Sequence, residues 1–251
     1  MQLRSWRQRR RRSQLDLALD AEISARHLSF LETGRSRPSR EMVLRLAEKL
    51  EVPLRERNGL LVAAGFAPLF PERPLDDPGL QAARRAVDLV LKGHEPFPAL
   101  AIDRHWNLVA SNAAVAPMLA GVDGSLLEPP VNVLRLSLHP AGLAPRIVNS
   151  GEWRLHLFER LQRQIELTAD RKLMELFEEL KEYPVREEQP GRPATDYGSV
   201  VVPFRLRAGE RELAFFSTTT VFGTPIDITL SELAIEAFFP ADEATAAALM
   251  G

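Results

Sequence analysis

The sequence predicts two domains, an all-α domain followed by an α+β domain built on a five-stranded antiparallel sheet. Apolar residues recur with helical spacing through residues 2–65, whereas β-favouring runs begin at residue 99. Between these regions, the segment FAPLFPERPLDDPG contains four prolines within eleven residues, a composition that ends helices and stiffens a connection. We therefore expect domains at residues 1–66 and 80–251, joined by a proline-rich linker at residues 67–79.

Composition limits the class of protein. A chain of 251 residues with 45% apolar content can bury a real core, and the absence of cysteine excludes disulfides and thiolate metal sites. The N-terminal segment MQLRSWRQRRRR lacks the apolar core of a signal peptide, and no uncharged apolar run approaches the roughly 20 residues that span a membrane. We expect a soluble, cytoplasmic protein that does not contact a membrane.

Charge is unevenly distributed along the chain. Residues 1–75 hold 15 Lys+Arg against 9 Asp+Glu, and residues 76–251 hold 17 against 25, so the two parts carry +6 and −8. A compact basic module favours a polyanionic partner, because arginine and lysine neutralise the phosphates of nucleic acids. The six arginines of the first twelve residues agree with that interpretation. The alternative is a solvated basic tail.

Five short helical patterns fill residues 2–65. Leu3 and Trp6 anchor the first pattern, and Gly65 ends the last. The other four begin at residues that commonly open helices: Ser13, Ser24, Ser39 and Pro53. The turns between them are too short for anything but a compact helical bundle.

The third pattern, ISARHLSFLETG, has an outward face that is not explained by packing. With Ser24 as N-cap and Gly34 as the stop, the helix covers residues 25–33. At about 100° per residue, Leu28 and Leu31 then point toward the bundle. The opposite side presents Ala25, Arg26, Ser29 and Phe30. That face requires a partner.

The second domain opens with an amphipathic helix that ends near Gly93. Two β-favouring runs follow at residues 99–103 and 107–111, with a helix directly after Asn112. Two well-patterned helices come next, one with Trp153 on its apolar face and one capped by Asp170.

The last third of the chain changes to a period of two. A hairpin turns at residues 208–210, with Val202, Phe204 and Leu206 on one face. A fifth strand at residues 233–239 alternates apolar residues with Glu232 and Glu236. We expect helices inserted between the second and third strands, and a sheet that is covered on one face.

The N-terminal patterns resemble a known family. SQ, LA, IS, LETGRSRPS and LRLAEKLEVP, within residues 2–66, are similar to the lambda-repressor-like, xenobiotic-response-element type of helix-turn-helix regulators. The resemblance implies a five-helix domain whose third helix lies in the major groove of DNA. One departure is Glu22, which stands in the turn where that family often has glycine.

The resemblance and the helical wheel together select candidate DNA contacts. Gln14 would hold a phosphate, Arg26 would pair with guanine, and the Phe30 ring would meet a thymine methyl group. Arg35 and Arg37 suit phosphate contacts. The complete candidate set is Gln14, Ser24, Ala25, Arg26, His27, Ser29, Phe30, Arg35 and Arg37. Two alternatives remain open, since His27 could be packed or solvated and Phe30 could fill a groove between helices.

The acidic domain resembles a second family. HEPFPALAIDRHWNLVASNAA, LSLHPAGL and IVNSGEWRLHLFERL, within residues 80–240, are similar to the PAS-like ligand-binding domain of MmyB-like transcriptional regulators. The resemblance implies a small-molecule ligand without naming it. No metal or other cofactor is expected.

Aromatic and aliphatic residues could wall a ligand cavity in this domain. The candidate walls are Trp106, Leu134, Trp153, Phe158, Phe204, Phe216 and Phe222. Residues that could orient a polar head group are Asn112, His139, Arg154 and Thr218. Each of them alone fits a core or surface residue better than a ligand contact. Together they favour a fatty-acid-like or other amphipathic ligand over a sugar or nucleotide.

Catalytic motifs are absent from the sequence. The five histidines show no metal-ligand spacing, and there is no nucleophile elbow, Walker loop or dinucleotide fingerprint. The leading hypothesis is therefore a non-enzymatic, ligand-controlled transcription regulator that binds operator DNA as a homodimer. The alternative keeps the DNA-binding domain and makes the second domain a ligand-free dimerisation or protein-partner module.

Overall fold

The computed structural model describes residues 2–184, 202–223 and 225–250, which divide into two compact units. The first unit holds the chain up to Arg73, with Glu166–Thr168 and the short helix α10 (Ile228–Ser231). The second unit holds the rest. The first division falls between Arg73 and Pro74, inside the segment predicted as a linker. The beginning of the predicted hairpin, residues 199–201, lies outside the described residues.

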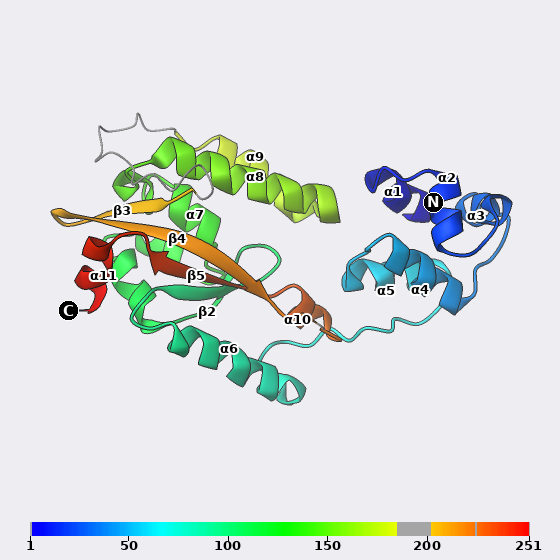
Figure 1. The fold of residues 1–251 in the computed structure, drawn as a ribbon, viewed down its shortest axis with the longest axis horizontal. Coiled ribbons are helices and arrows are strands. Elements are labelled where there is room, and N and C mark those ends of the chain that lie inside the picture. Colours follow the sequence, from blue (N-terminus) through cyan, green and yellow to red (C-terminus); the bar gives the residue numbers. More distant parts are fainter. Residues whose placement is uncertain (1, 185–201, 224, 251) are drawn as a thin grey trace. The chain divides into compact units, whose positions relative to one another are not determined.

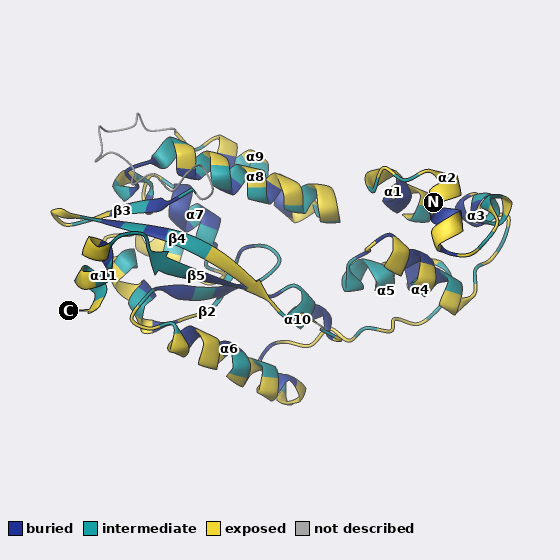
Figure 2. Cartoon of the chain, viewed as in Figure 1, coloured by how far each residue is buried: buried dark blue, intermediate teal, exposed yellow. Residues whose placement is uncertain are grey.

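Five helices form between residue 2 and residue 65, a stretch that is described throughout, which confirms the predicted all-α domain. They are α1 (Gln2–Arg9), α2 (Gln14–Asp20), α3 (Ala25–Glu32), α4 (Arg40–Lys49) and α5 (Leu54–Ala63) (Figure 1). Three serines cap them: the hydroxyl oxygens of Ser13, Ser24 and Ser39 accept hydrogen bonds from the backbone N–H three residues later. Each helix turns one apolar stripe inward, as the burial colours show (Figure 2).

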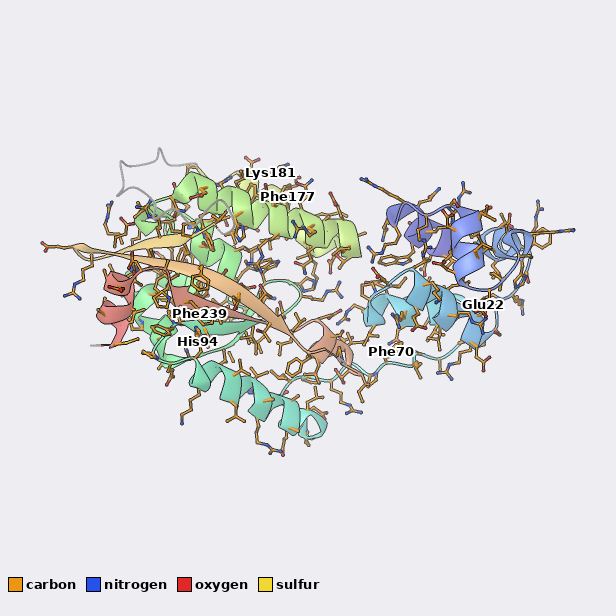
Figure 3. All side chains as sticks on the ribbon, viewed as in Figure 1. Glu22, Phe70, His94, Phe177, Lys181 and Phe239 are labelled. Atoms are coloured by element: carbon orange, nitrogen blue, oxygen red, sulfur yellow. The ribbon has the colours of Figure 1, made fainter. Side chains whose placement is uncertain are left out.

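The turn between α2 and α3 has a non-glycine residue in the left-handed conformation at its centre. Glu22, labelled in Figure 3, has a φ of 54°, in the left-handed region. The Ile23 N–H donates to the Ala18 carbonyl at 2.9 Å and closes the turn. The departure from the family pattern is therefore accommodated by backbone strain of about 1 kcal/mol.

Glu22→Gly should raise the free energy of unfolding of the first unit by up to about 1 kcal/mol, because glycine enters the left-handed region without strain. Hydrogen exchange of the α2 and α3 amides in the full chain measures the change. Glu48→Gly, at an exposed position in the last turn of α4, is the matched control and should destabilise by up to about 1 kcal/mol. If Glu22→Gly lowered the free energy of unfolding as much as Glu48→Gly does, the backbone at Glu22 would not be strained.

The second unit contains a sheet whose described strands all pair antiparallel, in the order β2-β1-β5-β4-β3. The strands are β1 (Ala99–Ile102), β2 (Leu108–Ser111), β3 (Phe204–Ala208), β4 (Arg211–Val221) and β5 (Ala234–Pro240). The helices are α6 (Gln81–Gly93), α7 (Val133–Leu138), α8 (Ser150–Thr168), α9 (Arg171–Lys181) and α11 (Glu243–Met250). The predicted five-stranded α+β fold, with helices inserted between the second and third strands, is confirmed.

Two smaller points complete the description of the helices. The segment after Asn112 is a 3₁₀ helix, η2 (Ala113–Leu119), rather than an α-helix, and it contains Pro117. Among the helices of the described residues, none is long and apolar enough to cross a lipid bilayer.

Helices cover both faces of the sheet, so the prediction of a single covered face is wrong. Helix α6 packs on one face, where Val87 and Leu91 meet Ala99 and Ile235. Helices α7, α8 and α9 lie on the other face (Figure 1). Because both faces are buried, β5 buries consecutive residues, and Glu236 is only 4% exposed. The alternating pattern placed Glu236 on the face opposite Ile235 and Ala237, and the structure shows that this face is buried too.

The β3–β4 hairpin turns where it was predicted, with Gly209 at a φ of 63°. Its register pairs Phe204 with Phe215 and Leu206 with Leu213, which places Phe215 on the α8 face. The neighbouring Phe216 points to the opposite face and stacks on Phe239 at 5.2 Å between ring centroids. His94 meets the edge of the same Phe239 ring (Figure 3).

Within the first unit, α10 and α5 hold residues 70–73, which lie in the first half of the predicted linker. The Ile228 N–H donates to the Pro71 carbonyl at 2.9 Å, and the Thr229 hydroxyl donates to the Arg73 carbonyl at 2.6 Å. The Asn58 side chain accepts from the Phe70 N–H and donates to the Phe70 carbonyl. The chain at residues 70–73 is therefore ordered by specific hydrogen bonds.

Candidate functional site

The exposed face of α3 is the first candidate site. Leu28 is fully buried and Leu31 is buried, whereas Arg26 is exposed and Ser29 and Phe30 are half-buried. The Arg26 guanidinium lies over the Phe30 ring, 5.4 Å from its centroid. This contact orients the Arg26 side chain on the outer face of α3. Phe30 therefore positions the arginine, and its half-buried ring also adds apolar surface to that face.

The remaining candidate DNA contacts surround this face. Ser24 is the N-cap, and its hydroxyl accepts the N–H of the half-buried His27 at 3.1 Å. Arg35 and Arg37 follow α3 and are exposed. Gln14 differs, because its amide donates to the Glu32 carboxylate at 2.7 Å and is thus already engaged inside the domain.

A buried ion pair below α3 escaped the sequence-based prediction. Arg7 of α1 donates to both carboxylate oxygens of Glu32, through Nε at 2.6 Å and a terminal nitrogen at 2.9 Å. Burial raises the pKa of Glu32, but the hydrogen bonds from Arg7 and Gln14 outweigh it and lower that pKa below its ordinary value. Arg7, Glu32 and Gln14 therefore fix α1 and α2 against the end of the recognition helix.

Acid should unfold the first unit through this pair. Since the folded-state pKa of Glu32 lies below its ordinary value of 4.5, the stability it contributes is fully present above that pH. The contribution disappears as the pH falls through the folded-state pKa. Hydrogen exchange of α1 and α3 against pH measures the loss, and Glu32→Gln should lack this part of the pH dependence. If the wild-type protein and Glu32→Gln lost stability over the same pH range and by the same amount, the Arg7–Glu32 pair would not be the cause of the acid sensitivity.

Three of the six N-terminal arginines, Arg7, Arg10 and Arg12, bind other parts of the domain, and the segment forms α1, so it is not the solvated tail that was the alternative. Arg10 donates to the carbonyls of Leu50 and Glu51, both at 2.9 Å, and Arg12 donates to the Lys49 carbonyl at 3.3 Å. These carbonyls end α4, where a helix leaves acceptors unpaired. Part of the positive charge of the N-terminal segment therefore serves the fold.

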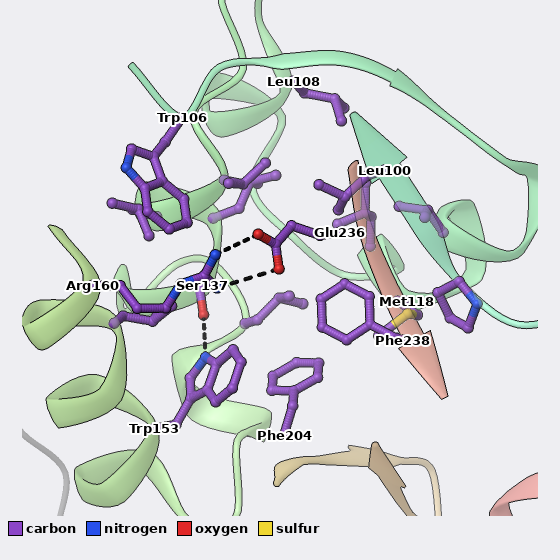
Figure 4. A pocket seen from close by; sticks show the side chains of 18 residues that line it. Leu100, Trp106, Leu108, Met118, Ser137, Trp153, Arg160, Phe204, Glu236 and Phe238 are labelled. Carbon is purple, nitrogen blue, oxygen red and sulfur yellow. Dashed lines mark hydrogen bonds and ion pairs between the residues drawn. The ribbon is translucent and has the colours of Figure 1, made fainter. Parts of the chain in front are cut away.

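The second candidate site is an apolar cavity of about 90 Å³ between the sheet and its helices (Figure 4). Its apolar walls include Leu100, Trp106, Leu134, Trp153, Leu157 and Phe204. They come from β1, the β1–β2 turn, α7, α8 and β3. This composition, apolar walls with a few polar groups, is that of small-molecule sites.

An ion pair closes one side of the cavity. Arg160 of α8 donates to both carboxylate oxygens of Glu236 on β5, and the guanidinium lies 4.9 Å from the Trp106 ring centroid. The Thr219 hydroxyl donates to Glu236 at 2.9 Å. On another wall, the Trp153 indole N–H donates to the Ser137 hydroxyl oxygen at 2.9 Å. Figure 4 draws the Arg160–Glu236 and Trp153–Ser137 bonds beside the cavity.

Four of the eleven predicted ligand-binding residues line this cavity: Trp106, Leu134, Trp153 and Phe204. Four others serve the fold elsewhere. Asn112 binds the backbone of Leu91, Phe97 and Ala99. The His139 ring accepts from the Ala141 N–H, and Arg154 donates to carbonyls at the end of α9. Phe158 packs on Phe177.

The last three, Phe216, Thr218 and Phe222, are not among the cavity-lining residues because of strand register. Successive strand residues point to opposite faces, so an error of one position reverses the face. Phe216 and Phe222 pack on the α6 side and Thr218 is exposed, whereas Phe215 and Thr219 point toward α8. The sequence reasoning missed Arg160, Glu236 and Ser137, which supply the polar groups of the cavity.

Comparison with known proteins agrees with this arrangement. Residues 83–250 match the family model described as the MmyB-like transcription regulator ligand binding domain, and residues 3–57 match a helix-turn-helix family. No curated protein matches the chain. The first family is named for regulation and ligand binding, and the second for the helix-turn-helix structure. Since the first match spans more than half of the sequence, the chain belongs to the MmyB-like transcription regulators and carries an N-terminal helix-turn-helix domain.

Proposed function

We propose that this protein regulates transcription by binding a specific operator, under the control of a small apolar or amphipathic, fatty-acid-like ligand in the second domain. The exposed Arg26 over Phe30, on a capped helix of the helix-turn-helix domain, supports the DNA-binding part. The apolar cavity supports the ligand-binding part. A bacterial-type regulator of this kind would work in the cytoplasm, where the chromosome lies.

One recognition helix reads too few base pairs for a useful specificity, and two-fold symmetric half-sites are the usual remedy. We therefore propose that the protein binds its operator as a homodimer. The residues proposed to touch DNA are Ser24, Ala25, Arg26, His27, Ser29, Phe30, Arg35 and Arg37, with Gln14 limited to its remaining amide hydrogen.

Arg26→Ala and Arg37→Ala should affect DNA binding in different ways. Loss of a bidentate arginine–guanine pair removes about 1–3 kcal/mol of discrimination, so Arg26→Ala should relax the sequence preference. Arg37→Ala should weaken binding to all duplexes alike and lower the salt slope by about 1. Fluorescence anisotropy with selected and scrambled duplexes over a salt series separates the two effects. The same response in both variants would contradict the assigned contacts.

The size of the cavity restricts its ligand. An apolar cavity of roughly 150 Å³ is known to bind benzene, and this one is about 90 Å³. A long acyl chain would therefore require side chains such as Met118, which is flexible, to move. We expect either a compact ligand or a cavity that widens around a longer one.

The small volume also favours the second hypothesis, a ligand-free dimerisation or partner module with a nearly filled interior. Native mass spectrometry of the full protein after mild purification distinguishes the two. A co-purified small molecule that is lost on denaturation supports the ligand-controlled regulator. A dimer with twice the mass of the chain alone, whose mass does not change when lipid extract is added, supports the ligand-free dimerisation or partner module.

Ligand control requires different ligand affinities in two states, typically worth about 1–3 kcal/mol. Glu236 and Phe238 of β5 line the cavity, and α10 ends only two residues before β5 begins. Helix α10 in turn binds the linker at Pro71 and Arg73. We propose that a ligand acts on the linker through this stretch of chain.

A further inference from the structure

We propose that the cavity selects an uncharged ligand, an apolar body that carries a hydrogen-bond acceptor such as a carbonyl or hydroxyl oxygen, over a free carboxylate or an ammonium ion. This inference rests on the ligand-binding function proposed above and narrows it: the ligand would have the apolar chain of a fatty acid with an uncharged head group, such as an amide, ester or alcohol, in place of the free acid.

The charges around the cavity cancel. Arg160 and Glu236 are the only ionisable side chains among the described residues that line it, and they bind each other. The Glu236 side chain is 5% exposed, so water contributes little to its stabilisation. The cavity therefore has a polar side with no net charge in a low-dielectric surrounding.

Arg160 and Glu236 already bind each other and share Thr219 as a further partner. Arg160 binds Glu236 and the Thr219 hydroxyl oxygen, at 3.2 Å, and its flat side covers Trp106. Glu236 accepts from Arg160 and from Thr219. A ligand carboxylate would have to share Arg160 with Glu236, which would place two buried carboxylates beside one guanidinium. A ligand ammonium ion would likewise place a second positive charge beside Arg160, with Glu236 as their shared counter-charge. Uncompensated buried charge is strongly unfavourable, so both charged head groups are disfavoured.

Ser137 supplies the complementary preference. Its oxygen accepts the indole N–H of Trp153, while its own hydroxyl hydrogen can still donate. Ser137 is 9% exposed and lines the cavity. A ligand oxygen that accepts this hydrogen bond needs no charge, which agrees with the balanced Arg160–Glu236 pair.

A set of three unbranched ligands, each with six carbon atoms, tests the inference: hexanamide, hexanoate and hexylamine. The amide and the carboxylate have nearly the same shape, so they differ mainly in charge. Ligand-observed NMR titration of the full protein near neutral pH should give an affinity for hexanamide at least about tenfold above that for either charged compound. Equal or tighter binding of hexanoate would overturn the head-group inference and leave the ligand cavity standing. Binding of none of the three would overturn the cavity's ligand-binding role as well.

Variants change the charge of the cavity wall. Glu236→Gln leaves Arg160 without its counter-charge, so hexanoate affinity should rise by at least about tenfold. Combining Arg160→Gln with Glu236→Gln restores neutrality and should restore the preference for the amide. Glu212→Gln is the control, because it removes the same charge from the Arg205–Glu212 pair, which is not part of the cavity wall. It should leave the affinities for all three ligands unchanged. No gain of hexanoate binding in the folded Glu236→Gln protein would overturn the inference. If that variant fails to fold, the comparison in the wild-type protein decides.

Discussion

Glu32→Ala should lower the free energy of unfolding of the first unit by about 3–5 kcal/mol. The substitution leaves the Arg7 guanidinium, whose side chain is 11% exposed, without its partner, and it removes the acceptor of Gln14. Small domains have only about 5–15 kcal/mol in total, so much of the first unit should unfold at physiological temperature. The protection of the α1 and α3 amides against hydrogen exchange and the affinity for DNA should fall together.

A double variant separates the ion pair from the packing around it. Arg7→Met with Glu32→Leu replaces two charges by apolar side chains of similar volume, and such replacements are often neutral or stabilising. We expect it to recover most of the stability that Glu32→Ala loses. If Glu32→Ala alone stayed within about 1 kcal/mol of the wild type, as for an exposed pair, the pair would not organise this domain.

Phe204→Ala should cost the second unit about 3–5 kcal/mol and enlarge the cavity. The Phe204 ring is buried, lies 4.9 Å from Trp153 and 5.8 Å from Phe238 between ring centroids, and lines the cavity. The added space is apolar and should stay dry until a small apolar molecule enters it. Benzene should therefore raise the thermal midpoint of Phe204→Ala more than that of the wild type.

Phe239→Ala is the matched control for this experiment. It also removes a phenylalanine from the sheet, but on the α6 face, away from the cavity. The variant should lose stability without gaining a response to benzene. An equal response to benzene in both variants would show that the cavity on the α8 face has no special capacity for a ligand.

Most of the fold follows from local patterns in the sequence. Ser13, Ser24 and Ser39 mark the starts of helices because their hydroxyls satisfy free backbone N–H groups, a requirement that does not depend on distant contacts. Gly209 marks the hairpin in the same way, through its positive φ. These local devices made the order of helices and strands predictable.

The face of each strand was harder to predict. The assignment of Phe216 and Thr218 to the cavity ignored the register that the turn itself imposes. A turn after Ala208 pairs Phe204 with Phe215, so the inward face of β4 could have been inferred from the inward face of β3. For Glu236 there was no such signal, because an acidic residue in an alternating strand ordinarily faces water.

Long-range polar pairs were not predictable from the sequence. Arg7 binds a partner 25 residues away and Arg160 binds one 76 residues away, so neither pairing leaves a local pattern. Arginine at the edge of an amphipathic stripe usually reaches solvent. In this protein the same residue type stabilises the recognition helix at Arg7 and completes the cavity wall at Arg160.

The central claim is that the outer face of α3 binds duplex DNA in a sequence-dependent manner. Selection from a random pool of double-stranded oligonucleotides, with the full protein and with or without lipid extract, tests it most directly. The account predicts enrichment of two symmetric half-sites about one helical turn apart, and a changed motif for Arg26→Ala. A wild-type pool that stays random under both conditions would contradict it.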